Sequence, residues 1–559
     1  MNTRFGAFEV DLDRRRLLKR GVPIALREQS FQVLAALMEH AGEIVTREEL
    51  RRRLWASDTF VDFEVALNSA VSRLRDALGD SAECPSFIET IPKRGYRFVV
   101  PIPKRPAVAV MPFANQTADA KDDYLSDGLT DELIRVLSRI DGLKVTAGSV
   151  VFRFKGQRCD ARQVGRELGV EAVLEGSVSR AGDRIRITVN LVGVKDGFNL
   201  WAQRFDGNLA GLFAIQDEVC GAVAEALHIR LASQLPKTHP SNANAYMQHL
   251  KGTYLLKRRR TDGIRRAFEY LQEAIRLEPD YAEPYYGAAM FYIVSTAYGA
   301  MPPRTALPEA EALLLKGLAL DENSATLHST LGMLRMFQWR WAESEQEHRR
   351  AINLEPGNAF PHMCYPILCS FLGRHEEAVF HAVKAVELDP LDLMTNFRLV
   401  QATCYARRYE EAVRAGRIAI ELTPDSPYTY FYLALSLAAL GSSEEAWDMA
   451  NAGRKLAGGM PLGEGYFGYL AGALGHATEA RTVIRNLQAR REQAYSPALP
   501  IVGTYLGLGE TADALSWLQT ALTERDPFLG SMMVFPAYDR IRDHLEFKRV
   551  AGELKLSTG

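Results

Sequence analysis

The sequence has few cysteines, and they do not cluster. Its 559 residues include six cysteines, none of them in a CxxC pair, which excludes a disulfide framework and fits a reducing compartment. Net charge is also small, −2 at pH 7, with 24% charged and 47% hydrophobic residues. This balance excludes both a disordered chain and a polycation that coats nucleic acid along its whole length.

Motifs of common enzymes are absent too. The chain contains no GxxxxGK[ST], no GxSxG and no HExxH, so we expect no catalytic residues, no metal and no cofactor. Uncharged windows occur at 284–303, 357–373 and 426–443, each interrupted by Pro, Gly, Ser or Tyr. We expect buried helices there rather than membrane spans, and hence a cytoplasmic protein that does not enter a membrane.

Residues 59–79 contain the pattern of an amphipathic helix. Asp62 can cap its start and Gly79 can end it. Apolar positions recur at the spacing of one buried helical face, namely Leu67, Val71, Leu74 and Leu78. The opposite face is short and polar, which suits a DNA major groove, and comprises Ser69, Ser72, Arg73 and Asp76 with Asn68 and Arg75 on its flanks.

The next segment has the pattern of a hairpin with a cationic tip. SFIETI and YRFVV are two strand-like runs on either side of 92–95, where Lys93 and Arg94 are adjacent. Two cations at the tip of a turn suit a phosphate backbone or a minor groove. Residues 1–105 hold 18 Lys and Arg against 15 Asp and Glu, so DNA binding would depend on where the cations lie rather than on their number.

SRLRDALGD followed by FIETIPKRGYRF resembles the winged helix-turn-helix of OmpR/PhoB-type response regulators and CadC-like regulators over residues 1–101. The resemblance implies contact with double-stranded DNA and leaves open a homodimer on that DNA. It also implies that alternating residues 5–26 form a small antiparallel sheet. Trp55 could equally be an ordinary core residue. The implied DNA-binding residues are Trp55, Asn68, Ser69, Ser72, Arg73, Arg75, Lys93, Arg94 and Arg97.

Residues 106–235 alternate between strand-like and helix-like runs, which predicts an α/β domain. Its AVMPFANQT, DGLTDELI and LWAQRFDG segments resemble the TolB amino-terminal-like domain. We expect Gly182 to lie in a hairpin turn rather than in a phosphate-binding loop. The acidic pairs Asp122–Asp123 and Asp131–Glu132 are expected to mark the start of a helix, where its dipole favours negative charge.

Beyond Pro236 the sequence repeats every 34 residues. AINLEP, AVELDP and AIELTP end at prolines 356, 390 and 424, and small residues recur where paired helices would touch. This pattern resembles tetratricopeptide repeats, whose superhelix binds peptides. We expect about eight units over 243–526, followed by a cap, within a domain of 243–559. MPPRTALPE is expected as an inserted loop, and Pro366 predicts a bent or shortened helix.

The predicted fold is therefore multidomain: a winged helix-turn-helix (α+β), an α/β domain and an all-α tetratricopeptide-repeat superhelix. Because the winged helix begins almost at Met1, we expect regulatory input to come from the C-terminal side. The sequence favours a soluble one-component transcriptional regulator that binds promoter DNA and senses a signal, or a protein or peptide partner on the repeats. The alternative is an interaction scaffold in which the winged helix binds protein.

Overall fold

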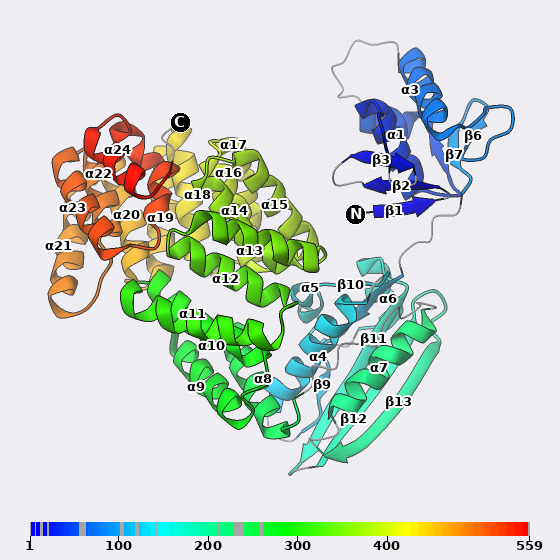
Figure 1. Ribbon diagram of the computed structural model, residues 1–559, viewed down its shortest axis with the longest axis horizontal. Helices are drawn as coiled ribbons and strands as arrows, with labels where there is room; N and C mark the ends of the chain where they lie inside the picture. Colours follow the sequence, from blue (N-terminus) through cyan, green and yellow to red (C-terminus); the bar gives the residue numbers. More distant parts are fainter. Residues whose placement is uncertain are drawn as a thin grey trace. The chain divides into compact units, whose positions relative to one another are not determined.

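A computed structural model describes most of the chain. The described residues are 2–5, 7–11, 15–19, 22–54, 63–100, 106–117, 122–140, 142–157, 159–182, 184–208, 212–227, 240–257 and 261–556. The chain forms two compact units, Met1–Arg105 and Pro106–Gly559, whose helices and strands are labelled in Figure 1.

The N-terminal unit is a winged helix with the small sheet that the sequence predicted. Four antiparallel strands come first: β1 (Asn2–Phe5), β2 (Phe8–Asp11), β3 (Arg16–Lys19) and β4 (Val22–Ile24). Three helices follow: α1 (Glu28–Glu39), α2 (Arg47–Leu54) and α3 (Phe63–Leu78). A second sheet has the order β5-β7-β6 and consists of β5 (Ile44–Thr46), β6 (Ile88–Ile91) and β7 (Gly95–Phe98).

The core of this unit joins α3 to both sheets. All four predicted apolar positions of α3 are at most 2% exposed. Phe5 of the first sheet meets Phe98 of the wing edge to face, with ring centroids 5.0 Å apart. Ser30 of α1 donates a buried hydrogen bond of 2.9 Å to the backbone oxygen of Ala70 in α3. These contacts fix the direction of α3 relative to the wing.

The second unit begins with a mixed sheet of order β10-β8-β11-β12-β13, with β9 paired to β11. Its strands are β8 (Ala107–Val110), β9 (Ala114–Asn115), β10 (Lys144–Val145), β11 (Ala172–Ala181), β12 (Arg184–Gly193) and β13 (Asn199–Asn208). The accompanying helices are α4 (Asp123–Ser138), α5 (Gly148–Phe152), α6 (Ala161–Leu168) and α7 (Leu212–Ala226). The α/β prediction is confirmed, and Gly182 lies in the β11–β12 hairpin turn with φ +63°.

One expectation about α4 was only half right. Asp122 and Asp123 do stand at its start, but Asp131 and Glu132 lie in its middle because the helix continues to Ser138. Glu132 instead forms an ion pair with Arg135, one turn further along the same helix. The helix dipole therefore does not explain that second acidic pair.

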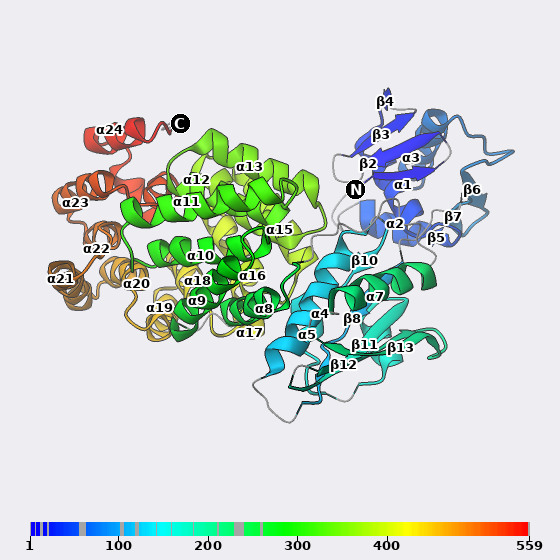
Figure 2. The same cartoon turned by 60° about the horizontal axis from the view of Figure 1, so that its bottom comes forward.

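Eight antiparallel helix pairs follow, as the 34-residue period predicted (Figure 2). The first four are α8 (Ala243–Lys257) with α9 (Thr261–Leu277), α10 (Glu283–Ala297) with α11 (Pro303–Leu320), α12 (Ala325–Phe337) with α13 (Trp341–Leu354), and α14 (Ala359–Phe371) with α15 (His375–Leu388). The last four are α16 (Leu393–Tyr405) with α17 (Tyr409–Leu422), α18 (Pro427–Ala439) with α19 (Ser443–Ala457), α20 (Pro461–Ala473) with α21 (Ala477–Gln493), and α22 (Leu499–Leu508) with α23 (Thr511–Glu524). A C-terminal segment adds η3 (Leu529–Met533), η4 (Pro536–Ile541) and α24 (Leu545–Glu553).

Two local predictions about these helices were wrong. MPPRTALPE is not an inserted loop, because α11 begins at Pro303 and continues through Pro308. Pro303 supplies a φ suited to the first helical position, and buried Ala306 and Ala310 anchor that turn. Helix α14 is not shortened by Pro366, since its 13 residues equal the length of α12.

The uncharged windows are the first helices of repeat pairs, as expected. Every residue from Pro361 to Phe371 in α14 is buried, the environment of a helix that is apolar on all sides. The array curves until the end of α10 meets later pairs, and the rings of Tyr298 and Tyr428 stack with centroids 6.1 Å apart. Among the described residues, no helix combines the length and hydropathy that a membrane crossing requires.

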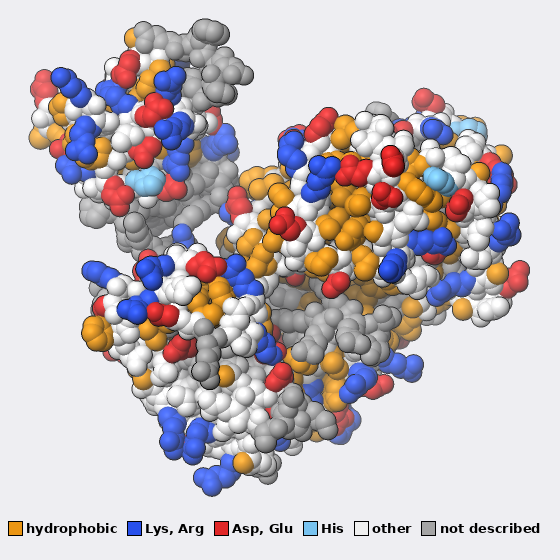
Figure 3. Space-filling model, turned by 180° about the vertical axis from the view of Figure 1, so that it is seen from behind, with side chains coloured by type: hydrophobic (Ala, Val, Ile, Leu, Met, Phe, Trp, Pro, Cys, Tyr) orange, Lys and Arg blue, Asp and Glu red, His pale blue; other side chains and the backbone are white. Residues whose placement is uncertain are grey.

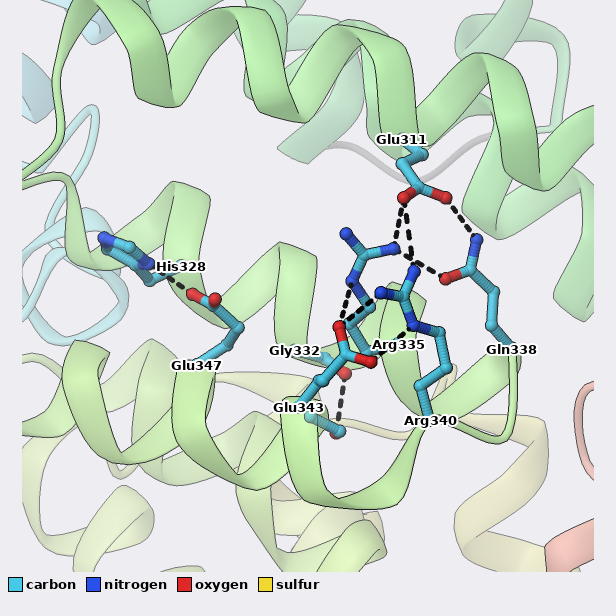
Figure 4. Close-up of polar contacts among 9 residues, drawn as sticks. Glu311, His328, Gly332, Arg335, Gln338, Arg340, Glu343 and Glu347 are labelled. Atoms are coloured by element: carbon cyan, nitrogen blue, oxygen red, sulfur yellow. Dashed lines mark hydrogen bonds and ion pairs between the residues drawn. The ribbon is translucent and has the colours of Figure 1, made fainter. Parts of the chain in front are cut away.

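Charged side chains also connect neighbouring pairs (Figure 4). Arg335 of α12 is 8% exposed and forms an ion pair with Glu311 of α11. Gln338 donates to the other oxygen of that carboxylate at 2.6 Å. Ser344 of α13 donates to the backbone oxygen of Gly332 at 2.7 Å, at a close contact between the two helices of one pair. Each buried polar group in this region therefore has a partner from an adjacent helix.

The α/β segment and the first repeat helices share one core. Helices α4, α7 and α8 cover the same face of the sheet, and a Cβ placed on Gly128 of α4 would lie 2.8 Å from Leu250 of α8. Arg135 of α4 also reaches Glu283 of α10 at 3.5 Å. Burial raises the pKa of Glu283 to about 7, although Arg135 opposes that shift. The contact therefore contains a carboxyl group that titrates near neutral pH.

We expect Glu283→Gln to change how stability depends on pH. The pKa of Glu283 is raised from 4.5 to about 7, so proton binding favours the folded state between these values and the advantage is lost as pH rises through 7. Relative to the wild type, the variant should gain roughly 1–3 kcal/mol of unfolding free energy between pH 5 and pH 8. Urea unfolding of the full chain measures this, with exposed Glu410→Gln as the matched control. An equal difference at both pH values would contradict the assignment.

Candidate nucleic-acid interface

Helix α2 begins with the capping arrangement that the sequence predicted. The backbone N–H of Thr46 donates to Glu49 Oε2 at 2.7 Å, and the backbone N–H of Glu49 donates back to Thr46 Oγ1 at 3.2 Å. This exchange anchors the first turn of the helix that precedes α3. Trp55 and Asp62, predicted as a DNA contact and as a helix cap, lie outside the described residues.

Helix α3 presents the predicted polar face. Asn68 and Ser72 are exposed, whereas Ser69 and Arg73 are half-buried. Arg73 Nη2 donates to Ser69 Oγ at 2.7 Å along the helix. The face therefore consists of short side chains with one guanidinium group, and positive-φ Gly79 follows the end of α3.

Arg75 has a different environment from Arg73. Its Nη2 atom donates to the backbone oxygen of Ile88 and to Thr90 Oγ1, both at 2.8 Å. Ile88 and Thr90 belong to β6, so this side chain connects α3 to the wing. The structure thus places Arg75 against the protein rather than on the polar face.

The wing carries its two cations at the tip, as predicted. Lys93 and Arg94 are exposed in the turn between β6 and β7, and Lys93 has a φ of +61°. Gly95 is required just beyond them, because a Cβ there would lie 2.0 Å from the backbone oxygen of Val45. Arg97 turns away from the tip and forms an ion pair with Glu89 on β6 at 2.6 Å.

Sequence reasoning missed a polar network that holds Asn68. Its Oδ1 atom accepts hydrogen bonds from Tyr96 Oη at 2.8 Å and from both Nη atoms of Arg47 at 3.3 Å. Arg47 also forms an ion pair with Glu64 at 2.5 Å. No local pattern announces this network, because its members come from α2, α3 and β7.

Helix α2 adds three more arginines that sequence reasoning did not select. Arg51, Arg52 and Arg53 are consecutive and exposed, and the RRR run is their signal in the sequence. Arg51 and Arg52 lie within ion-pair distance of Glu48, and Arg53 lies 2.7 Å from Glu39. Figure 3 likewise shows Lys and Arg interspersed with Asp and Glu on one face of this unit.

Asp80 fixes the connection between α3 and the wing. Its carboxylate accepts backbone hydrogen bonds from Ser86 at 2.6 Å, Phe87 at 3.3 Å and Ile88 at 2.7 Å. Three donors on one carboxylate hold the start of β6 beside the end of α3. The polar face of α3 and the cationic tip of the wing are therefore parts of one preorganised surface.

Two family models match consecutive parts of the chain. Residues 21–98 match "Transcriptional regulatory protein, C terminal", and residues 104–220 match "HilA/YgeH-like transcriptional regulator, second domain". The N-terminal unit is thus a winged helix of the OmpR/PhoB type, as its sequence resemblance implied. The α/β segment, which resembles TolB amino-terminal-like domains, matches a module of transcriptional regulators.

Three curated relatives show the same mixture of classes. The chain is 33% identical over 253 residues to "Putative adenylate cyclase 3" of Rhizobium meliloti, covering 44% of this chain and 42% of the relative. It is 22% identical over 358 residues to "Transcriptional regulator HilA" of Salmonella paratyphi A, covering 61% and 63%. It is 30% identical over 100 residues to "Transcriptional activator CadC" of Escherichia coli, covering 18% and 19%. The matches thus span less than two thirds of each relative.

We expect Arg75→Ala to loosen the wing rather than to remove a base contact. The change deletes both hydrogen bonds to β6, which should lower the local opening free energy of β6 and the end of α3 by about 1–3 kcal/mol. Amide hydrogen exchange over 75–98 measures this effect. Ser72→Ala, on the exposed face of the same helix, is the control and should change protection little. Unchanged protection in Arg75→Ala would show that its contacts are dispensable.

Proposed function

We propose that this protein is a transcriptional regulator that binds promoter DNA through its winged helix and receives its input through the Pro106–Gly559 unit. The observation that carries the proposal is the polar face of α3 beside the exposed Lys93 and Arg94. A short polar helix face fits the major groove, and adjacent cations suit phosphates. The family matches over residues 21–98 and 104–220 support the same reading.

The arginines of this surface divide into two roles in the proposed complex. Arg73 lies on the polar face of α3, where its guanidinium can reach a base edge once it releases Ser69. Arg94 lies at the wing tip and meets the backbone of any sequence. Arg75, Arg97 and Asn68 orient the surface, because their polar atoms are already engaged with the wing or with α2.

We expect Arg73→Ala and Arg94→Ala to weaken DNA binding in different ways. Loss of Arg73 should cost about 1–3 kcal/mol on a duplex selected from a random pool and should relax base preference at one position. Loss of Arg94 should weaken all duplexes alike and reduce the salt slope of log K by about 1. Titration of the full chain against selected and scrambled duplexes at several salt concentrations measures both effects.

Glu83→Gln is the matched control for these variants, because Glu83 is an exposed residue of the α3–β6 connection away from the wing tip. Identical, sequence-independent losses from Arg73→Ala and Arg94→Ala would show that α3 does not enter the groove. The alternative, a scaffold whose winged helix binds protein, predicts no salt-sensitive binding to any member of the pool. Sedimentation of the complex shows whether one copy or a homodimer occupies the DNA.

The repeats offer a surface for a protein partner, but on their second helices. The first helices from α12 to α18 are largely buried, which leaves little exposed concave face for a peptide there. Exposed apolar side chains instead lie on α15 and α17, namely Phe380, Val383, Ile418 and Leu422. We therefore place the partner contact of the proposed regulator on these outer helices.

We also propose that the chain is not a nucleotide cyclase. The curated cyclase is matched over only 42% of its length, and the chain's other named matches are to regulators. Within the described parts of the chain, no group of three or more His, Cys, Asp or Glu could hold a metal ion. A binding and sensing role for the α/β segment explains these observations without catalysis.

We expect purified full-length protein to convert no ATP to cyclic AMP in the presence of Mg²⁺ or Mn²⁺. The reason is that phosphoryl chemistry depends on metal ions held by carboxylates and on a phosphate-binding loop. Chromatographic detection of cyclic AMP is the measurement, with a known cyclase as the positive control. Product that disappears on Asp127→Asn, a change in the buried carboxylate of α4, would overturn this expectation.

A further inference from the structure

The C-terminal segment packs against the turns of the repeats. Trp339 Nε1 donates to the backbone oxygen of Asp526 at 3.2 Å, and Trp341 Nε1 donates to that of Leu554 at 2.6 Å. Arg407, between α16 and α17, forms an ion pair with Asp539 of η4 at 2.8 Å. Parts of the chain more than 100 residues apart therefore meet along this edge.

A cavity of about 460 Å³ lies between this segment and two of the repeat turns, within the size range of small-molecule sites. One wall comes from the α14–α15 and α16–α17 turns and the other from the C-terminal segment. The cationic or titratable side chains that line it are His375, Arg407, Arg542 and Lys555, while Phe371 and Met533 contribute apolar surface. No Asp or Glu is among the described residues that line it.

The positive charges of this cavity are only partly compensated. Asp539 lies behind the wall and accepts from Arg407 Nη2 at 2.8 Å and from Arg542 Nε at 2.9 Å. Within the described chain, Arg407 Nη1 and His375 Nδ1 are buried without a hydrogen-bond partner. Burial lowers the pKa of His375, and the charges of Arg407 and Arg542 lower it further. One carboxylate thus faces two arginines and a lysine.

The backbone at two of these cations is unfavourable for any residue except glycine. The turn between the helices of a pair recurs every 34 residues with positive φ, and four of these positions are glycine: Gly373, Gly441, Gly475 and Gly509. Arg407 occupies the equivalent position with φ +61°, and Lys555 has φ +56°. A non-glycine residue in this region costs on the order of 1 kcal/mol. Such strain is often retained where the side chain serves a ligand.

We propose that this cavity binds a small organic anion, with its carboxylate or phosphate group on Arg407 and Lys555 and its apolar body against Phe371 and Met533. Arg407 Nη1 supplies an unused donor, and charge-assisted hydrogen bonds to an anion are the strongest that it can make. The anion would join the repeat turns to the C-terminal segment. If the regulator function proposed above holds, this site receives its chemical signal, but binding can be tested without DNA.

The experiment uses the full chain and three probes of one shape. Sodium benzoate, phenyl phosphate and neutral benzyl alcohol are titrated at constant ionic strength, with melting temperature and calorimetric heat as readouts. We expect a saturable rise in melting temperature with at least one of the anions, because a ligand that binds only the folded state stabilises it. The two anions distinguish a carboxylate site from a phosphate site, and benzyl alcohol should produce no saturable shift.

Glycine substitutions test the cavity without disturbing the backbone. Arg407→Gly and Lys555→Gly restore the residue that positive φ favours while removing one cation each, so both variants should stay folded. Each should bind the anion at least about tenfold more weakly, the equivalent of one charge-assisted hydrogen bond. Arg525→Gly is the matched control, because Arg525 has φ +58° and stacks on Trp339 outside the cavity.

Two results would overturn the proposal. One is the absence of a saturable shift with either anion in the wild type. The other is a shift that survives in Arg407→Gly and Lys555→Gly, or that falls equally in Arg525→Gly, since the anion would then bind elsewhere on the surface. Loss of anion binding with intact DNA binding separates this site from the proposed function of the winged helix.

Discussion

Close contact between helices at small side chains is the constraint on which the larger unit depends. Ala412 and Ala419 of α17 are fully buried, and a Cβ on Gly332 would lie 2.9 Å from the ring of His348. Helix axes approach closely only where one partner has little side chain, so these positions determine how each pair stacks on the next. The 34-residue period of small residues is therefore also the period of the positive-φ turns.

Burial of charge explains why the α/β segment and the repeats form one unit. Arg135 of α4 lies between Glu132 of its own helix and Glu283 of α10, and Arg139 forms an ion pair with Glu355 at the end of α13 at 3.1 Å. A buried arginine without its carboxylates is costly, so separating these parts would be unfavourable. A signal received on the repeats thus has a packed, polar connection to the sheet.

The winged helix separates arginines that build the surface from arginines that project from it. Arg47 and Arg75 connect helices to the wing, and Arg97 is paired across β6 and β7. Arg94 remains exposed at the tip, and Arg73 makes only a hydrogen bond within its own helix. The small positive excess of this unit is consistent with DNA binding, because a few well-placed cations carry the contact.

The sequence alone determined features that depend on neighbours along the chain. The buried stripe of α3, the Thr46–Glu49 cap, the wing hairpin and the eight helix pairs all follow from periods of 3.6, 2 and 34 residues, because those periods set which side chains share a face. Tertiary structure decided the rest. Pro303 to Glu309 became helix rather than loop because buried alanines anchor it. Arg75 turned to the wing, and Arg407 met Asp539 from 132 residues away, because hydrogen-bond partners far apart in sequence are chosen by the packing of whole elements and leave no local pattern.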